Sequence, residues 1–189
     1  MKKSYILILI FYVSAVLTVP AQSRIYKPFK VDMGMSTFIT TDVATNNGTG
    51  FYFHMIYNLT DKFSFGPRME LGYVLQDDPN LIAAAFNNGV MSMFSFQGVS
   101  DYYLSTERVR FFLGLGFGLY RQTLIFQDVS SLYFGTDELS LVNLGLNPRV
   151  GFNVGHFKMA ANYNMTGEIL YNYLNFTLGL EIGGGRYHK

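Results

Sequence analysis

Ser36 and His54 are the two residues whose types could form a nucleophile and its base. Both lie in segments where polar and apolar residues alternate, and hairpin counting places them opposite each other in the middle of a sheet. A substrate in lipid or at the surface could not reach a pair there, so a core hydrogen bond is the preferred interpretation. We expect no catalytic residue, with a lipid- or peptide-modifying enzyme that uses Ser36 or His54 as an alternative.

The other reactive residue types give no ligand site. The chain has no cysteine, which excludes a disulfide framework and a thiolate metal site. His156 and His188 lack the spacing of metal ligands. Asp77-Asp78 and Asp137-Glu138 are paired carboxylates without the spacing of a calcium loop. We therefore expect no metal and no cofactor. The formal net charge of +1 argues against a nucleic-acid partner.

Charged residues outside these groups occur mainly in segments with a period of two, which is typical of β-strands. From 63 to 75, for example, Phe65, Met69 and Leu71 share one face, while Arg68 and Glu70 share the other. Eight segments of this kind are predicted as strands: 29–39, 50–59, 63–75, 90–102, 109–120, 141–154, 157–165 and 173–183.

Composition indicates that the apolar face of these strands meets lipid. Only 14% of the residues are charged, against about 25% in a typical soluble domain. No mature segment approaches the ~20 apolar residues of a membrane helix. In hydrocarbon every backbone polar group must pair internally, which leaves a closed barrel. The sequence predicts an all-β fold: a closed antiparallel up-and-down transmembrane β-barrel of about eight strands.

The predicted connections alternate in length. Those at 60–62, 104–108 and 155–156 are short, as periplasmic turns of outer-membrane barrels are. The others are generally longer and would lie outside the cell. Outer-membrane lipid is the expected partner of the wall, and an extracellular ligand could bind the outer loops at 40–49, 76–89, 121–140 and 166–172. The sequence does not predict an oligomeric state.

The first residues have the pattern of an export signal. Lys2 and Lys3 precede a largely apolar stretch from 6 to 19, and Val19-Pro20-Ala21 supplies compact residues before a cleavage point. We predict a signal peptide at 1–21, cleaved near Ala21, and a barrel domain at 22–189. The mature protein would cross the periplasm and reside in the outer membrane.

The inward charges are predicted to form a polar network that fills the lumen, because an eight-stranded barrel is only just wide enough for side chains and unpaired buried charge is costly. Hairpin counting puts Asp101 opposite Arg110, and closure of the barrel brings Glu181 near Lys30. The alternative is a narrow pore for ions or small solutes. The predicted lumen network comprises Lys30, Asp32, His54, Arg68, Glu70, Asp101, Arg110, Arg149, Lys158 and Glu181.

A soluble barrel of the lipocalin type is the main alternative fold. It would be apolar inside and would carry its charge on a water-facing exterior. Here the charged face holds only about one charge per strand among Gly, Asn, Ser and Thr, which suits an enclosed lumen better.

Several segments together resemble the porin-like outer-membrane β-barrel family. They are Ala21-Gln22, the Gly-rich run at 114–118, the segment 147–152 and the segment 178–183. The resemblance implies an eight-stranded barrel in the outer membrane but no particular activity. The chain departs from the family in continuing past Gly183 instead of ending in an aromatic residue. Pro67 and Pro148 lie inside strands, where we expect bulges.

Overall fold

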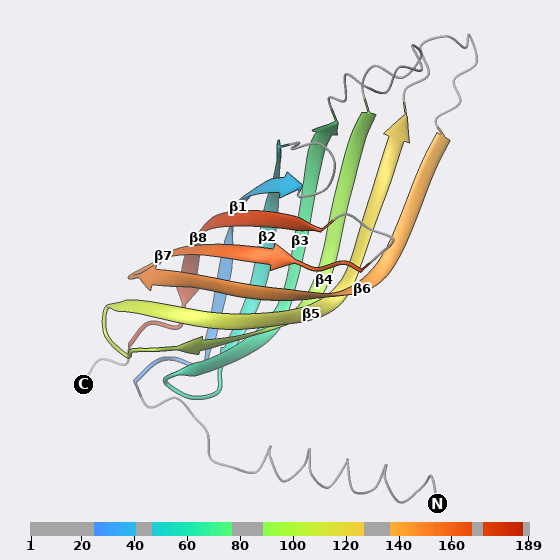
Figure 1. Cartoon of the computed structure of the whole chain (residues 1–189). Helices are drawn as coiled ribbons and strands as arrows, with labels where there is room; N and C mark the ends of the chain where they lie inside the picture. The colour runs from blue at the N-terminus through green and yellow to red at the C-terminus, as the bar shows by residue number, and fades with distance from the viewer. Residues whose placement is uncertain (1–24, 41–46, 77–88, 127–136, 168–171, 187–189) are drawn as a thin grey trace, which may run out of the picture.

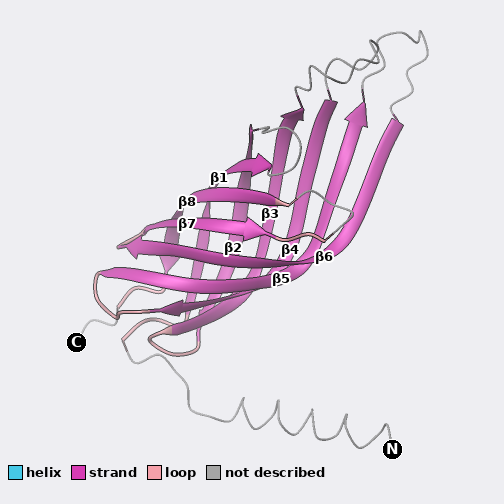
Figure 2. Cartoon of the chain, in the orientation of Figure 1, coloured by secondary structure: helices cyan, strands magenta, loops and turns pink. Residues whose placement is uncertain are grey.

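A computed structural model describes residues 25–40, 47–76, 89–126, 137–167 and 172–186. The predicted signal peptide and the central parts of the four predicted outer loops lie outside the described residues. Every regular element in the described part is a strand (Figure 2). The eight strands are β1 (Phe29–Thr40), β2 (Asn47–Asn58), β3 (Phe63–Gln76), β4 (Gly89–Tyr103), β5 (Val109–Phe126), β6 (Asp137–Val154), β7 (Phe157–Asn164) and β8 (Tyr173–Gly183).

No helix in the described part of the chain is long and apolar enough to cross a membrane.

The strands form one closed antiparallel sheet in which each pairs with its neighbours in sequence. β1 closes the barrel by pairing with β8, from Lys30 opposite Gly183 to Thr40 opposite Tyr173 (Figure 1). Closure leaves no unpaired first or last strand. The predicted fold class, a closed up-and-down barrel of eight strands, is confirmed.

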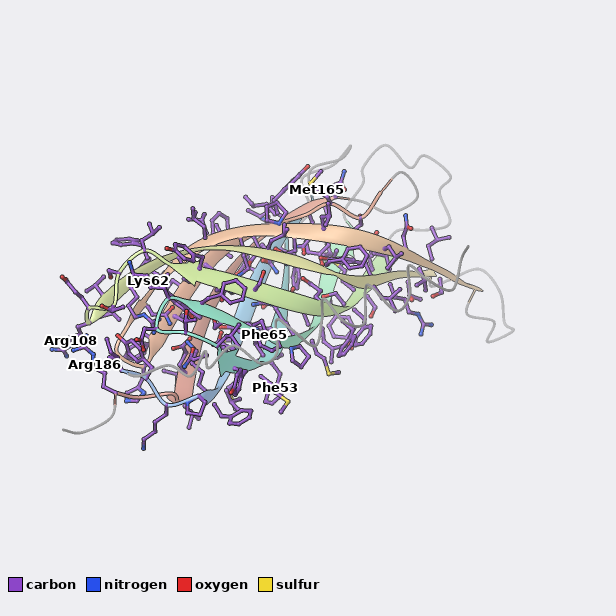
Figure 3. The ribbon with its side chains drawn as sticks, turned by 90° about the horizontal axis from the view of Figure 1, so that it is seen from below. Phe53, Lys62, Phe65, Arg108, Met165 and Arg186 are labelled. Carbon is purple, nitrogen blue, oxygen red and sulfur yellow. The ribbon has the colours of Figure 1, made fainter. Side chains whose placement is uncertain are left out.

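Side chains alternate between the two faces of the wall as the period of two predicts. Phe51, Leu71 and Leu115 are each more than half exposed on the outside. Phe53 and Phe65 also project from the outer surface (Figure 3). Polar residues between them in sequence are buried in the lumen. The apolar side of the barrel is therefore the outer side, opposite to the arrangement in a lipocalin-like barrel.

Two predicted boundaries are wrong at the end of the barrel with the longer connections. β5 continues to Phe126 and β6 begins at Asp137, and the two pair residue by residue to their ends. The predicted loop at 121–140 therefore contains a strand extension on each side. Alternation fails to reveal it because Gln122 and Thr123 are adjacent polar residues that are both buried.

The proline positions interrupt pairing without a bulge. His54 pairs with Arg68 and Tyr57 with Phe65, so the register of β2 and β3 is identical on both sides of Pro67. The ladder of β6 and β7 likewise stops at Arg149 and resumes, in the same register, as a bridge between Leu146 and Met165. The bulges expected at Pro67 and Pro148 are absent, because a missing donor opens the ladder locally without inserting a residue.

Glycines facing the lumen make room for large side chains from strands one or two places away. Gly50 and Gly72 pair across β2 and β3, and the ring of Phe38 from β1 lies over both. A Cβ at Gly72 would overlap that ring. Gly114 leaves similar space for Asp101 and Arg149. Asp101 and Arg149 come from the two strands that flank Gly114, whereas Phe38 on β1 lies two strands away from Gly72 on β3.

Gly72→Ala is expected to lower the free energy of unfolding by about 1–3 kcal/mol, the usual cost of overpacking a core. Phe38 is fully buried and its ring has no space to move into. Urea titration of the protein folded in phospholipid vesicles measures the change. Gly98→Ala is the matched control, since its Cβ would meet only Phe117 O at 3.9 Å. Equal stability of the two variants would contradict this packing.

The two ends of the barrel differ in height. β3, β4, β5 and β6 extend well beyond β1, β2, β7 and β8 at the end with the longer connections (Figure 1). At this end β6 pairs with β5 on one side but has no described partner on its β7 side above the Leu146–Met165 bridge. The short turns, the start of β1 and the end of β8 lie together at the other end, which we call the turn end.

Candidate functional site: the lumen

Lys158 on β7 is the centre of an ionic cluster inside the barrel. Its Nζ donates to Asp101 Oδ2 at 3.0 Å and lies 3.7 Å from both Asp32 Oδ2 and Glu181 Oε1. Strands β1, β4, β7 and β8 supply these groups, so the cluster spans the lumen. Its six members are Lys30, Asp32, Asp101, Arg149, Lys158 and Glu181.

Two further cations complete the charge balance of the cluster. Lys30 Nζ lies 2.8 Å from Glu181 Oε1, and it also donates to the hydroxyl of Tyr103 at 2.9 Å. Arg149 Nε lies 3.4 Å from Asp101 Oδ1. Asp101 thus faces two cations at once, as Glu181 does.

Arg68 and Glu70 form a second, smaller pair on β3. Arg68 Nη2 lies 3.3 Å from Glu70 Oε1, and its guanidinium stacks 4.2 Å from the centre of the Tyr52 ring. Tyr52 in turn donates to Asp32 Oδ1 at 2.8 Å. Asn175 donates to Glu70 Oε1 at 2.7 Å from β8. This pair therefore connects with the larger cluster through an aromatic side chain.

Arg110 lies apart from both groups, at the turn end. Its guanidinium is stacked between two aromatic rings, 4.1 Å from the centre of Tyr26 and 3.7 Å from that of Tyr103. Each such cation–π contact is worth about 0.5–2 kcal/mol, more when it is desolvated. We call Tyr26, Arg110 and Tyr103 the turn-end stack.

An apolar layer lies inside the barrel toward the end with the longer connections. Its members come from β1, β3, β4, β5 and β8, and they pack on one another with almost no exposure. Tyr120 also donates to Asn164 Oδ1 at 3.1 Å, which satisfies its hydroxyl. We call this layer the apolar layer; it consists of Phe38, Val74, Met91, Met93, Tyr120 and Tyr173.

All ten residues of the expected lumen network are buried, but two expected pairings are wrong. Asp101 lies opposite Gly114, and Arg110 is opposite Asn153, so Asp101 and Arg110 are not partners. His54 lies opposite Asp32, while Ser36 lies opposite Gly50. Hairpin counting fails because each turn sets its own register. Ser36 and His54 therefore do not face each other as a nucleophile and a base.

The sequence interpretation missed the aromatic part of the lumen. Phe38, Tyr103 and Tyr173 were not assigned to the lumen, although each lies two residues from an inward polar residue of its own strand. The alternation of side chains along each strand would have been enough to place these three residues in the lumen. His54 makes no hydrogen bond through either ring nitrogen within the described residues. No cluster of metal-ligating side chains occurs in the described part of the chain.

Comparisons with known proteins support the fold. No family model and no curated protein matches the sequence. A similar solved structure is Ail, the attachment invasion locus protein of Yersinia pestis, in complex with the heparin analogue sucrose octasulfate. Its TM-score is 0.57 at 15% identity, over 82% of this chain and 100% of that chain. A second structure of Ail has a TM-score of 0.54 at 13% identity, over 82% and 99% of the two chains. The resemblance to small outer-membrane β-barrels is thus confirmed at the level of the fold.

Proposed function

We propose that the protein is a non-enzymatic integral outer-membrane barrel with a closed lumen, whose outer loops bind an external partner. The observation that carries the proposal is the reversal of polarity across the wall: Phe, Leu and Met side chains cover the outside, and the ionised groups are enclosed. An apolar exterior of this extent is stable in hydrocarbon and aggregates in water.

The orientation follows from the two ends of the barrel. Outer-membrane barrels have short turns on the periplasmic side and longer loops outside. The short turns and both ends of the described chain lie together at the turn end. The predicted signal peptide agrees with export to this location. We therefore propose that the tall wall of β3–β6 stands outside the cell and carries the longer loops away from the lipid.

The charge of the outer segments indicates the chemistry of the partner. The ranges 40–49, 76–89, 121–140 and 166–172 contain seven acidic residues and a single basic residue, Arg121. The ligand in the Ail structure is a sulfated sugar, which an acidic surface would repel. We propose instead that the external partner of this protein presents a cationic surface.

Epitope tags test the location and the orientation. A tag between Ser130 and Ser131 is expected to bind antibody on intact cells, because that range faces outward in the proposal. A tag between Asp61 and Lys62 is expected to bind antibody only after the outer membrane is permeabilised. The purified protein should also migrate faster unheated than boiled on a gel, as folded barrels do. Labelling of the 61–62 tag on intact cells would overturn the orientation.

The same cells test the partner class. Cells that express the protein should bind a fluorescent oligoarginine peptide more strongly than cells that carry a variant with Asp77, Asp78 and Asp128 changed to Asn. Fluorescent heparin should bind no better than to cells without the protein. Heparin binding that depends on the protein would refute a cationic partner, while leaving the membrane location unaffected.

A further inference from the structure

A cavity of about 320 Å³ opens at the turn end, away from the proposed partner surface. Arg108, Arg110 and Arg186 line it together with Asn153 and Glu181. Arg108 and Arg186 lie at the same end of the barrel, away from Met165 (Figure 3). Three guanidinium groups around one small cavity are unusual in a chain with few charges, and the lumen network does not use Arg108 or Arg186.

The segment after β8 builds one wall of this cavity. Gly183 and Gly184 have φ values of 85° and 60°, which favour glycine and turn the chain back across the mouth of the barrel. Gly185 O accepts a hydrogen bond from Lys27 N at 3.0 Å, and Arg186 forms a β-bridge with Tyr26. Residues 184–186 thus run beside the segment before β1, and they bring Arg186 to the cavity.

Arg110 supplies a guanidinium group that is held in place and still has an unused hydrogen-bond donor. It is 6% exposed, and its guanidinium is held in the turn-end stack. One terminal nitrogen donates to Asp61 O at 2.9 Å, but Nε has no hydrogen-bond partner in the described structure. An unpaired buried donor of a charged group is costly. A ligand with acceptor oxygens would remove that cost.

The charge in the cavity favours an anion. Arg186 lies beside the turn-end stack, with its guanidinium 5.7 Å from the centre of the Tyr26 ring. Glu181 would oppose an anion, but Lys30 at 2.8 Å and Lys158 at 3.7 Å already balance its charge. Glu107 is the one other carboxylate among the lining residues. The arginines therefore outnumber the uncompensated acids.

We propose that the turn-end cavity binds a phosphate group, held by Arg110 and Arg186 with Arg108 at the entrance. Guanidinium forks match the spacing of phosphate oxygens, and such charge-assisted hydrogen bonds are about twice as strong as neutral ones. The phosphate comes either from a free soluble ester or from the headgroup of an anionic phospholipid in the adjacent leaflet. The site is independent of the proposed function of the outer loops.

Isothermal titration calorimetry with inorganic phosphate tests the site on the full mature chain folded in neutral detergent. Saturable binding is expected, and Arg186→Gln should weaken it about tenfold, as loss of a charge-assisted contact does. Arg108→Gln should weaken it less. Arg121→Gln is the matched control, because it removes the same charge from an exposed arginine near the opposite end. Arg110→Gln is informative only if it folds; Arg186 is exposed, so its variant keeps the test valid.

Vesicles of different lipid composition distinguish a free phosphate ester from a phospholipid headgroup as the source of the phosphate. If the site takes a headgroup, vesicles of phosphatidylglycerol should stabilise the wild-type protein against urea more than vesicles of phosphatidylcholine do, and Arg186→Gln should abolish the difference. Saturable binding of free phosphate without that lipid effect identifies a soluble ligand. The proposal is overturned if neither effect occurs, or if Arg121→Gln reduces binding as much as Arg186→Gln.

Discussion

Asp101→Asn is expected to lower the free energy of unfolding by about 3–5 kcal/mol, the usual cost of breaking a buried ion pair from one side. Asp101 is buried and faces Lys158 Nζ at 3.0 Å and Arg149 Nε at 3.4 Å. Lys158 keeps Asp32 and Glu181 nearby when Asp101 is neutral. Arg149 has no other carboxylate within 4 Å in the described structure, so its charge is left without compensation. Urea titration in phospholipid vesicles measures the loss.

A double-mutant cycle separates the energy of the ionic interaction between Asp101 and Arg149 from the effect of changing each side chain by itself. Arg149→Gln combined with Asp101→Asn should be more stable than the sum of the two single effects, because both charges are then removed together. Asp61→Asn is the control: it neutralises an aspartate on the turn at 59–62, and its effect should stay within about 0.5 kcal/mol. Additive effects of Asp101→Asn and Arg149→Gln would show that these side chains do not interact.

Which side chains enter the lumen could be predicted from the sequence, whereas their partners could not. Both wrong pairings, Asp101 with Arg110 and Ser36 with His54, are displaced from the observed register by an even number of residues. Such a displacement keeps every side chain on its own face and changes only its partner. The face on which a side chain lies is set locally by alternation along its strand, but the register between strands depends on the geometry of each turn.

The ion pairs themselves depend on the closed barrel. Lys158 on β7 reaches Asp101 on β4, and Asn175 on β8 reaches Glu70 on β3. These strands are not neighbours, so counting residues across a hairpin cannot predict the contacts between them. They follow from the tilt and stagger with which eight strands close. The cavity at the turn end was missed for the same reason: Tyr26 and Arg186 meet where the two ends of the sheet join, and Arg110 contacts Tyr26 from β5.

The second large effect concerns ion flow. The wild-type protein in a planar bilayer is expected to give no current steps, because two barriers block the lumen in series. The apolar layer fills one half with Phe38, Tyr120 and Tyr173 in mutual contact. The turn-end stack, with Arg110 between two aromatic rings, closes the other half. The interior of an eight-stranded barrel is only just wide enough for such side chains to fill it.

Two barriers in series give a characteristic pattern among variants. Phe38→Ala with Tyr173→Ala opens the apolar layer, and Arg110→Ala opens the turn-end stack, but each variant should stay silent because the other barrier remains. The combination of all three changes with Lys158→Ala, which removes the centre of the ionic cluster that spans the lumen between the two barriers, should give discrete current steps. Heat-modifiable migration of each variant on a gel provides the control that the barrel has folded, so that silence reports a closed lumen.

The pattern distinguishes a filled lumen from the narrow pore that was the alternative interpretation of its charges. If Arg68, Glu70, Arg110 and Arg149 lined a conducting path, the wild-type protein would give current steps, and Arg68→Ala with Glu70→Ala would change their size or ion selectivity. In the filled lumen these charges hold side chains in place, so the same pair of changes should alter stability and leave the bilayer silent. Steps from the wild-type protein would refute the filled lumen outright, whatever the variants do.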